Sequence, residues 1–335
     1  MADGEREPDC EAGCAPPREI DALVGHTDAV QEFESLHRDG RLHHAWMITG
    51  PKGVGKASLA YLLAGKMLAG DADEDAARQK IRAQAHPNLL TIRRPWDDKR
   101  KRWKGEITID EIRRVPDFFS QSPGEAGWRI AIIDSMDELN NNASNALLKT
   151  LEEPPEKGLL FLLTHSPGRL LPTIRSRCRR LDLRPPARDE SLNWLVEQHG
   201  IAAGDAEAAL DMAAGAPGRA LALERSGAIG MEQDIAGLFD RLPRWDAKLS
   251  RRLSAKVSAK SGNVLRPHFY ATLTRQAANR ARIEAAEGRS PDPWLGAWQR
   301  LKGLAREADD IYLDPKQAAL AALAQIEHAA REANR

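Results

Sequence analysis

The chain contains the octapeptide Gly50-Pro51-Lys52-Gly53-Val54-Gly55-Lys56-Ala57, which follows the phosphate-binding loop pattern G-x-x-x-x-G-K up to its last position. Residues 45–49 before it form a short apolar run typical of a buried strand, and residues 57–69 carry apolar side chains at helical spacing. In such a strand–loop–helix unit, backbone N–H groups surround phosphate oxygens, and Lys56 reaches the β- and γ-phosphates. This context disfavours the alternative, a glycine-rich turn with a chance lysine.

Two positions lack the groups that ATP hydrolysis uses. The last loop position normally carries Ser or Thr, whose hydroxyl binds Mg²⁺, but here it is Ala57. Ser58 follows one residue later, about 100° further around the helix, so we expect its hydroxyl to point away from a metal. Asp134 ends a second apolar strand, where P-loop proteins hold Mg²⁺, but Ser135 follows instead of a carboxylate that activates water. We therefore predict a degenerate nucleotide site, with Asp134 as a mere cap of the next segment as the alternative.

Alternating apolar strands and helices predict an α/β domain with a parallel sheet. Strands are expected over residues 45–49, 88–94, 106–109, 129–133 and 159–163, and helices over 28–37, 57–69 and 145–151. After residues 184–186 no strand pattern remains, and helices are expected to break at Pro243, Pro267, Pro291–Pro293 and Pro315. The predicted domains are a disordered acidic tail over 1–17, a P-loop α/β domain over 18–184, a small helical lid over 185–228 and a helical domain over 229–335.

Composition narrows the class of protein. The 335 residues include 49 Lys and Arg against 49 Asp and Glu, which gives a formal net charge of zero and disfavours a general nucleic-acid-binding protein. Cys10, Cys14 and Cys178 are the only cysteines, too few for a disulfide framework or a four-cysteine zinc site. The N-terminus lacks the apolar core of a signal peptide, and no run of 18 apolar residues occurs. We expect a cytoplasmic protein with no metal site and no membrane partner.

Two further motifs carry a family resemblance. Residues 145–155 read NALLKTLEEPP, and residues 173–178 read TIRSRC. With residues 25–67, 107–184 and 313–319, they make the chain resemble the AAA+ clamp-loader family of bacteria, and within it the delta-prime type of DNA polymerase III. The resemblance implies an AAA+ P-loop domain, a helical lid and an all-α C-terminal collar that holds the subunits together. The family's four-cysteine zinc module is missing, because no cysteine lies between Cys14 and Cys178.

The resemblance also assigns residues to roles. Arg177, the Arg of Ser-Arg-Cys, implies an arginine finger that reaches the ATP of an adjacent subunit and neutralises charge on its γ-phosphate. The alternative places Arg177 in a solvated basic run. Thr164, at a strand end, resembles the first sensor of the nucleotide. Arg219 lies where the second sensor falls, and either contacts phosphates or forms a helix N-terminal turn.

These roles imply a subunit that loads the sliding clamp onto primed DNA in DNA replication. Its partners would be the ATPase subunits and the clamp-opening subunit of the loader. Ala57 and Ser135 favour a non-hydrolysing stator that requires no cofactor, although ATP or ADP could be bound without turnover. The alternatives are an ATP-hydrolysing motor of the gamma/tau kind and a stand-alone nucleic-acid-binding protein. A P-loop kinase fits poorly, because no phosphoacceptor site is recognisable.

Two small features remain open. Trp96 and Trp103 flank a basic run, residues 99–102, that could stack on bases and contact phosphates. We favour a hairpin whose tryptophans pack across two strands. Cys10 and Cys14 form an isolated C-x₃-C pair without further ligands, which favours a chance pair over a metal site.

Overall fold

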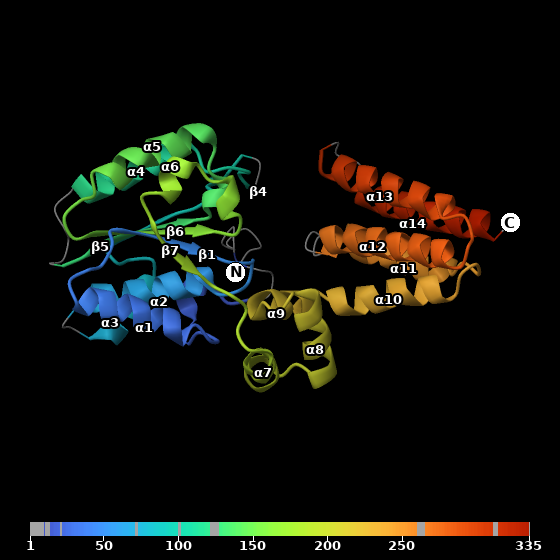
Figure 1. Cartoon of the computed structure of the whole chain (residues 1–335), viewed down its shortest axis with the longest axis horizontal. Helices are drawn as coiled ribbons and strands as arrows, with labels where there is room; N and C mark the ends of the chain where they lie inside the picture. The colour runs from blue at the N-terminus through green and yellow to red at the C-terminus, as the bar shows by residue number, and fades with distance from the viewer. Residues whose placement is uncertain are drawn as a thin grey trace. The chain divides into compact units, whose positions relative to one another are not determined.

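The computed structural model of the chain describes residues 10, 14–20, 22–70, 73–99, 102–120, 127–259, 265–310 and 314–334. The chain divides into two compact units, Met1–Leu221 and Ala222–Arg335 (Figure 1). The first holds the α/β domain and most of the predicted lid, and the second holds helices. The finer four-part division stays a prediction. Most of the acidic tail, residues 1–9 and 11–13, lies outside the described residues.

The predicted parallel sheet is confirmed. Its strands are β1 (Ala45–Thr49), β2 (Leu89–Ile92), β5 (Arg129–Asp134), β6 (Gly158–Thr164) and β7 (Arg179–Asp182), in the order β2-β5-β6-β1-β7. All neighbouring strands are parallel, with Thr49 opposite Thr164 and Asp134 opposite Leu163. The carboxyl ends of β1, β5 and β6 therefore meet at one edge, where open α/β sheets bind ligands.

Helices cover both faces of the sheet, as Figure 1 shows. One face carries α1 (Thr27–Arg38), α2 (Lys56–Ala69) and α3 (Glu74–Arg82), and the other carries α4 (Ile109–Ser120), α5 (Asn141–Glu152) and α6 (Pro172–Arg175). Successive β1 side chains alternate between the two cores: Trp46 packs with the first set of helices and Met47 with the second. Because both faces of the sheet are covered, β1 and β6 are buried along their whole length and apolar up to their last residues, Thr49 and Thr164.

Two sequence predictions for this domain were wrong. Residues 106–109 do not form a strand: Ile107 makes only an isolated bridge to Leu139, and helix α4 begins at Ile109. Acidic residues at positions 110 and 111, in the first turn of α4, favour a helix start. Strand β7 was missed because it lies at the sheet edge, where only Leu181 of its four residues is buried.

The predicted tryptophan hairpin is confirmed. Strand β3 (Trp96–Asp97) pairs antiparallel with β4 (Arg102–Trp103), and the two indole rings meet edge to face with centroids 5.1 Å apart. Such cross-strand aromatic contacts stabilise a short ribbon. Residues 100 and 101 of its basic turn lie outside the described residues.

Beyond β7, helices are the only regular secondary structure among the described residues, as predicted. The first are α7 (Arg188–Asn193), the π-helical turn η4 (Trp194–Gln198), α8 (Ala203–Met212) and α9 (Pro217–Arg225). The second unit contains α10 (Ala228–Asp240), α11 (Ala247–Ser258), α12 (Leu265–Ala286), α13 (Asp292–Asp310) and α14 (Pro315–Ala333). Pro267, Pro293 and Pro315 fall in first helical turns, where a missing N–H does no harm. Among the described residues, no helix is long and apolar enough to cross a membrane.

Candidate functional site

The glycine-rich loop joins β1 to α2 at the carboxyl edge of the sheet. Gly53 and Gly55 have φ angles of +75° and +107°, which side-chain-bearing residues rarely adopt, and Gly55 caps the N-terminus of α2. The loop therefore has the backbone conformation that its glycine pattern predicts.

Lys56 folds back onto this loop. Its Nζ donates hydrogen bonds to the carbonyl oxygens of Gly50 and Pro51, both at 2.8 Å. Burial lowers the pKa of Lys56 from 10.5 to about 8, although Asp134 and Asp137 act in the opposite direction. The lysine is thus a poorly solvated cation that its own loop holds in place.

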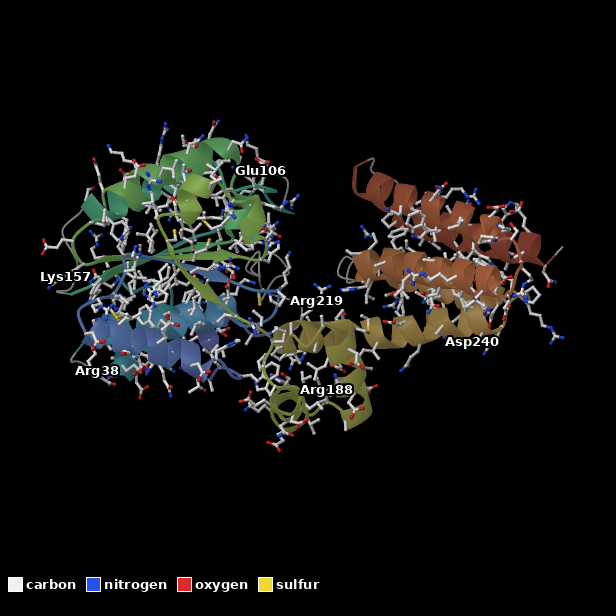
Figure 2. All side chains as sticks on the ribbon, in the orientation of Figure 1. Arg38, Glu106, Lys157, Arg188, Arg219 and Asp240 are labelled. Carbon is white, nitrogen blue, oxygen red and sulfur yellow. The ribbon has the colours of Figure 1, made fainter. Side chains whose placement is uncertain are left out.

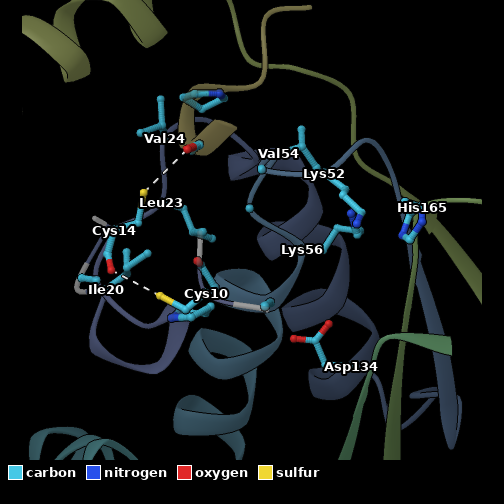
Figure 3. A pocket seen from close by; sticks show the side chains of 18 of the residues that line it. Cys10, Cys14, Ile20, Leu23, Val24, Lys52, Val54, Lys56, Asp134 and His165 are labelled. Atoms are coloured by element: carbon cyan, nitrogen blue, oxygen red, sulfur yellow. Dashed lines mark hydrogen bonds between the residues drawn. The ribbon is translucent and has the colours of Figure 1, made fainter. Parts of the chain in front are cut away.

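A cavity of about 370 Å³ opens beside the loop (Figure 3). That volume is at the small end of the range for ligand pockets. Ala57 and Ser58 both line it. The remaining lining comes from the P-loop, the segments after β2, β5 and β6, the lid and the N-terminal segment. These residues are Lys52, Gly53, Val54, Gly55, Lys56, Arg94, Asp134, Ser135, Glu138, His165, Trp194, Pro217, Gly218, Cys10, Cys14, Ala15, Pro17, Ile20, Ala22, Leu23 and Val24.

The N-terminal segment was not expected in this site. Cys14 Sγ donates to the Gly218 carbonyl at 3.8 Å, and Pro17–Glu19 form a short 3₁₀ helix. Cys14, Ala15 and Pro17, which the sequence places in the predicted tail, line the cavity, and Figure 3 shows Cys14 there. Their composition is that of a tail, but residues 17–19 pack against α2 and α3, and Cys14 contacts Gly218.

Asp137 organises the carboxyl ends of β5 and β6, a role that the sequence analysis missed. Its side chain is only 4% exposed. It accepts hydrogen bonds from Ser135 Oγ (2.8 Å), Thr164 Oγ1 (3.0 Å) and the backbone N–H groups of His165 (2.8 Å) and Ser166 (3.0 Å). Burial alone would raise the pKa of Asp137, but these bonds together outweigh it and hold the pKa below its ordinary value. The carboxylate is therefore ionised and structural.

The hydrogen bonds of Asp137 include Thr164, the residue predicted as the first sensor of the nucleotide. Thr164 is fully buried, its hydroxyl donates a hydrogen bond to Asp137, and its side chain does not line the cavity. The next residue, His165, does line it. A sequence signal for the pair exists in retrospect: a polar residue at a strand end precedes a histidine in an otherwise apolar run.

The carboxylates near the end of β5 are engaged. Asp134 lines the cavity and interacts with another group. Glu138, the next carboxylate that lines it, forms an ion pair with Arg94 at 2.9 Å. No described residue at the end of β5 therefore supplies an unengaged base in the position that Ser135 vacates.

The lid contacts the loop directly. The backbone N–H of Gly218 donates to the Gly53 carbonyl at 2.9 Å. A Cβ atom at Gly53 would lie 2.3 Å from the backbone nitrogen of Arg219, so both glycines are needed for this approach. The Arg219 side chain projects from the start of α9 (Figure 2) and does not line the cavity.

Arg177 lies outside this cavity. It follows α6 and leads into β7, with its side chain 35% exposed. Its guanidinium contacts the carboxylate of Glu152 at 2.8 Å and donates to the Thr173 carbonyl at 3.0 Å. Beside it, burial raises the pKa of Cys178 to about 12.

Comparison with known proteins identifies the family. Residues 25–187 match the family model described as "DNA polymerase III, delta subunit". The delta-prime subunit of DNA polymerase III from Pseudomonas aeruginosa is 31% identical over 226 residues, which cover 66% of each chain. The Escherichia coli delta-prime subunit is 34% identical over 201 residues, covering 57% of this chain and 58% of that one. This chain belongs to the clamp-loader subunit family and is delta-prime-like.

The delta-prime-like chain is also similar to other loader subunits. The gamma subunit of DNA polymerase III from Buchnera aphidicola is 32% identical over 163 residues, covering 48% of this chain and 44% of that one. A solved gamma-subunit-related protein from Thermotoga maritima covers 89% of this chain and 99% of its own, with 19% identity and a TM-score of 0.43. The matched region spans two thirds or less of the delta-prime relatives' length.

Proposed function

We propose that this chain is a clamp-loader subunit that does not hydrolyse ATP and that donates Arg177 to the ATP site of a neighbouring subunit. The position of Arg177 supports this role most strongly, because its guanidinium is partly exposed and outside the chain's own cavity. Its present partners, an exposed carboxylate and a backbone carbonyl, are weak enough to be replaced by a phosphate.

The chain's own cavity does not fit Mg²⁺-dependent hydrolysis. Ala57 offers no hydroxyl ligand, Ser135 donates its hydroxyl to Asp137, and Glu138 is paired with Arg94. The glycine-rich loop and Lys56 remain suited to a phosphate. ATP or ADP would therefore be held without turnover, and the loader's chemistry would take place in other subunits.

In this role the chain acts within a complex. Its partners would be ATPase subunits and the clamp-opening subunit, and through them the sliding clamp and primed DNA. The helical second unit would supply the collar contact. DNA polymerisation would belong to another subunit of the holoenzyme, and the cytoplasmic location expected from the sequence fits this role.

The arginine role is tested by Arg177→Ala in a reconstituted loader. We expect the DNA-stimulated ATPase rate at the dependent site to fall by about a hundredfold or more, because the charge that develops on the γ-phosphate is no longer neutralised. Arg175→Ala, which removes an exposed arginine two residues away, is the matched control and should leave turnover unchanged. Equal turnover in wild type and Arg177→Ala would contradict the proposal.

The non-hydrolysing role is tested on the purified chain alone. Labelled ATP and ADP are titrated with and without Mg²⁺, and hydrolysis is assayed in the same samples. We expect no turnover, with or without binding. Mg²⁺-dependent turnover would instead support the gamma/tau-type motor, which the similarity to gamma subunits keeps as the second candidate.

A further inference from the structure

His165 is a titratable residue of the cavity that the proposed function does not use. It lies directly after β6, with its side chain 28% exposed, and it lines the cavity. Figure 3 shows the Lys52 and Lys56 side chains pointing toward its ring. Three nitrogen-bearing side chains thus converge at the mouth of the glycine-rich loop.

The hydrogen bonding of the ring fixes its tautomer. His165 Nδ1 lies 2.9 Å from Asp137 Oδ2. Because the ionised carboxylate of Asp137 can only accept, Nδ1 carries a hydrogen and donates it. The nitrogen that gains or loses a proton is therefore Nε2, on the side of the ring away from Asp137.

We propose that His165 Nε2 forms, with Lys52 and Lys56, a phosphate-binding site whose occupation requires uptake of a proton by the imidazole. In the neutral ring Nε2 has a lone pair and would repel a phosphate oxygen. Once protonated, it donates a charge-assisted hydrogen bond. The ligand class is a polyphosphate, either that of a nucleoside triphosphate or an inorganic one. This inference deepens the proposed retention of phosphate binding without hydrolysis, and rests on it.

The charges around His165 determine whether phosphate binding takes up or releases a proton. Burial lowers the pKa of His165; Asp137 from the turn after β5 raises it, while Lys52, Lys56 and Arg169 lower it further. Without a bound anion the ring is therefore mainly neutral at pH 7. A bound phosphate neutralises the lysine charges and adds negative charge, so the pKa must rise and a proton is taken up.

The pH dependence of binding follows from linkage. Where His165 is neutral in the free protein and protonated in the complex, affinity falls about tenfold for each pH unit gained. This slope is the upper limit, and we expect affinity to fall as pH rises over pH 6–7.5. Lys56, with its pKa of about 8, adds a second loss of affinity at higher pH. The two steps are separable, because only the first depends on the imidazole.

The test is isothermal titration of the full chain with ATP and, separately, with inorganic tripolyphosphate, both without Mg²⁺. Each titration is repeated at pH 6–7.5 in two buffers of different ionisation enthalpy, which reports the protons taken up. We expect wild type to take up a measurable fraction of one proton. His165→Asn should abolish this uptake: its short amide keeps a donor for Asp137 but removes Nε2. The control His44→Gln, outside the cavity and bound to the Leu151 carbonyl, should behave as wild type.

The outcomes separate the possible ligands. Proton-coupled binding of both probes, or of ATP alone, supports the proposal with a nucleotide as ligand; binding of tripolyphosphate alone supports it with an inorganic polyphosphate. The proposal is overturned if neither probe binds, if binding is independent of pH, or if folded His165→Asn keeps the uptake of wild type. Since none of these results involves Arg177 or the assembled loader, the arginine role can fail or survive independently.

Discussion

Lys56→Met should change the pH dependence of the chain's stability. The pKa of Lys56 falls from 10.5 to about 8 on folding, and one pKa unit corresponds to about 1.4 kcal/mol. Between these two values the unfolded chain binds more protons than the folded chain, so stability rises with pH. The lowered pKa of Lys56 reduces the free energy of unfolding by about 3 kcal/mol at pH 7 and by about 1 kcal/mol at pH 10.

Methionine removes this titration but keeps much of the side chain's volume. The hydrogen bonds to the Gly50 and Pro51 carbonyls are also lost, which gives an offset of about 1–3 kcal/mol that does not depend on pH below 8. The informative quantity is therefore the difference in unfolding free energy between wild type and variant as a function of pH. We expect wild type to gain about 2 kcal/mol on the variant between pH 7 and pH 10.

The assay is urea unfolding of both proteins at pH 7, 8, 9 and 10, followed by far-ultraviolet circular dichroism. Titration of all other groups cancels in the difference. Lys52→Met, on the exposed part of the same loop, shows how much any lysine-to-methionine change in the loop contributes. A Lys56 difference that stays constant within about 0.5 kcal/mol would refute a strained, desolvated lysine.

Two other predictions concern packing. Gly53→Ala should destabilise the first unit by about 3 kcal/mol, because φ at this position is +75° and the new Cβ would meet the Arg219 backbone. The control Gly204→Ala, which has open space around it, should be neutral or slightly stabilising. Thermal melting of both variants measures the difference. Cys178 should react with iodoacetamide about a thousandfold more slowly in the folded chain than in the unfolded chain at pH 8, because its thiol, with a pKa of about 12, has so little thiolate. Mass spectrometry of timed samples measures that ratio, and equal rates would show that the thiol is not buried.

The features that the sequence predicted are those that neighbouring residues determine. The strand before Gly50, the loop glycines and the helix after them are local patterns, and so are the apolar runs of β5 and β6. The missed features depend on contacts between distant segments. Asp137 gains its role only when β6 brings Thr164 and His165 beside it, and Cys14 contacts Gly218, 204 positions away.

The same contrast changes what the loop motif means. Gly53 is required by the close approach of the lid at Arg219, whether or not a nucleotide binds. The glycines alone therefore do not indicate a ligand in this chain. Lys56 does, because its burial opposes folding while the amine is charged, and its two hydrogen bonds to loop carbonyls leave its pKa lowered. A bound phosphate is the kind of group that would offset that penalty, so the lysine, rather than the glycines, is the residue of the motif that favours a retained phosphate site.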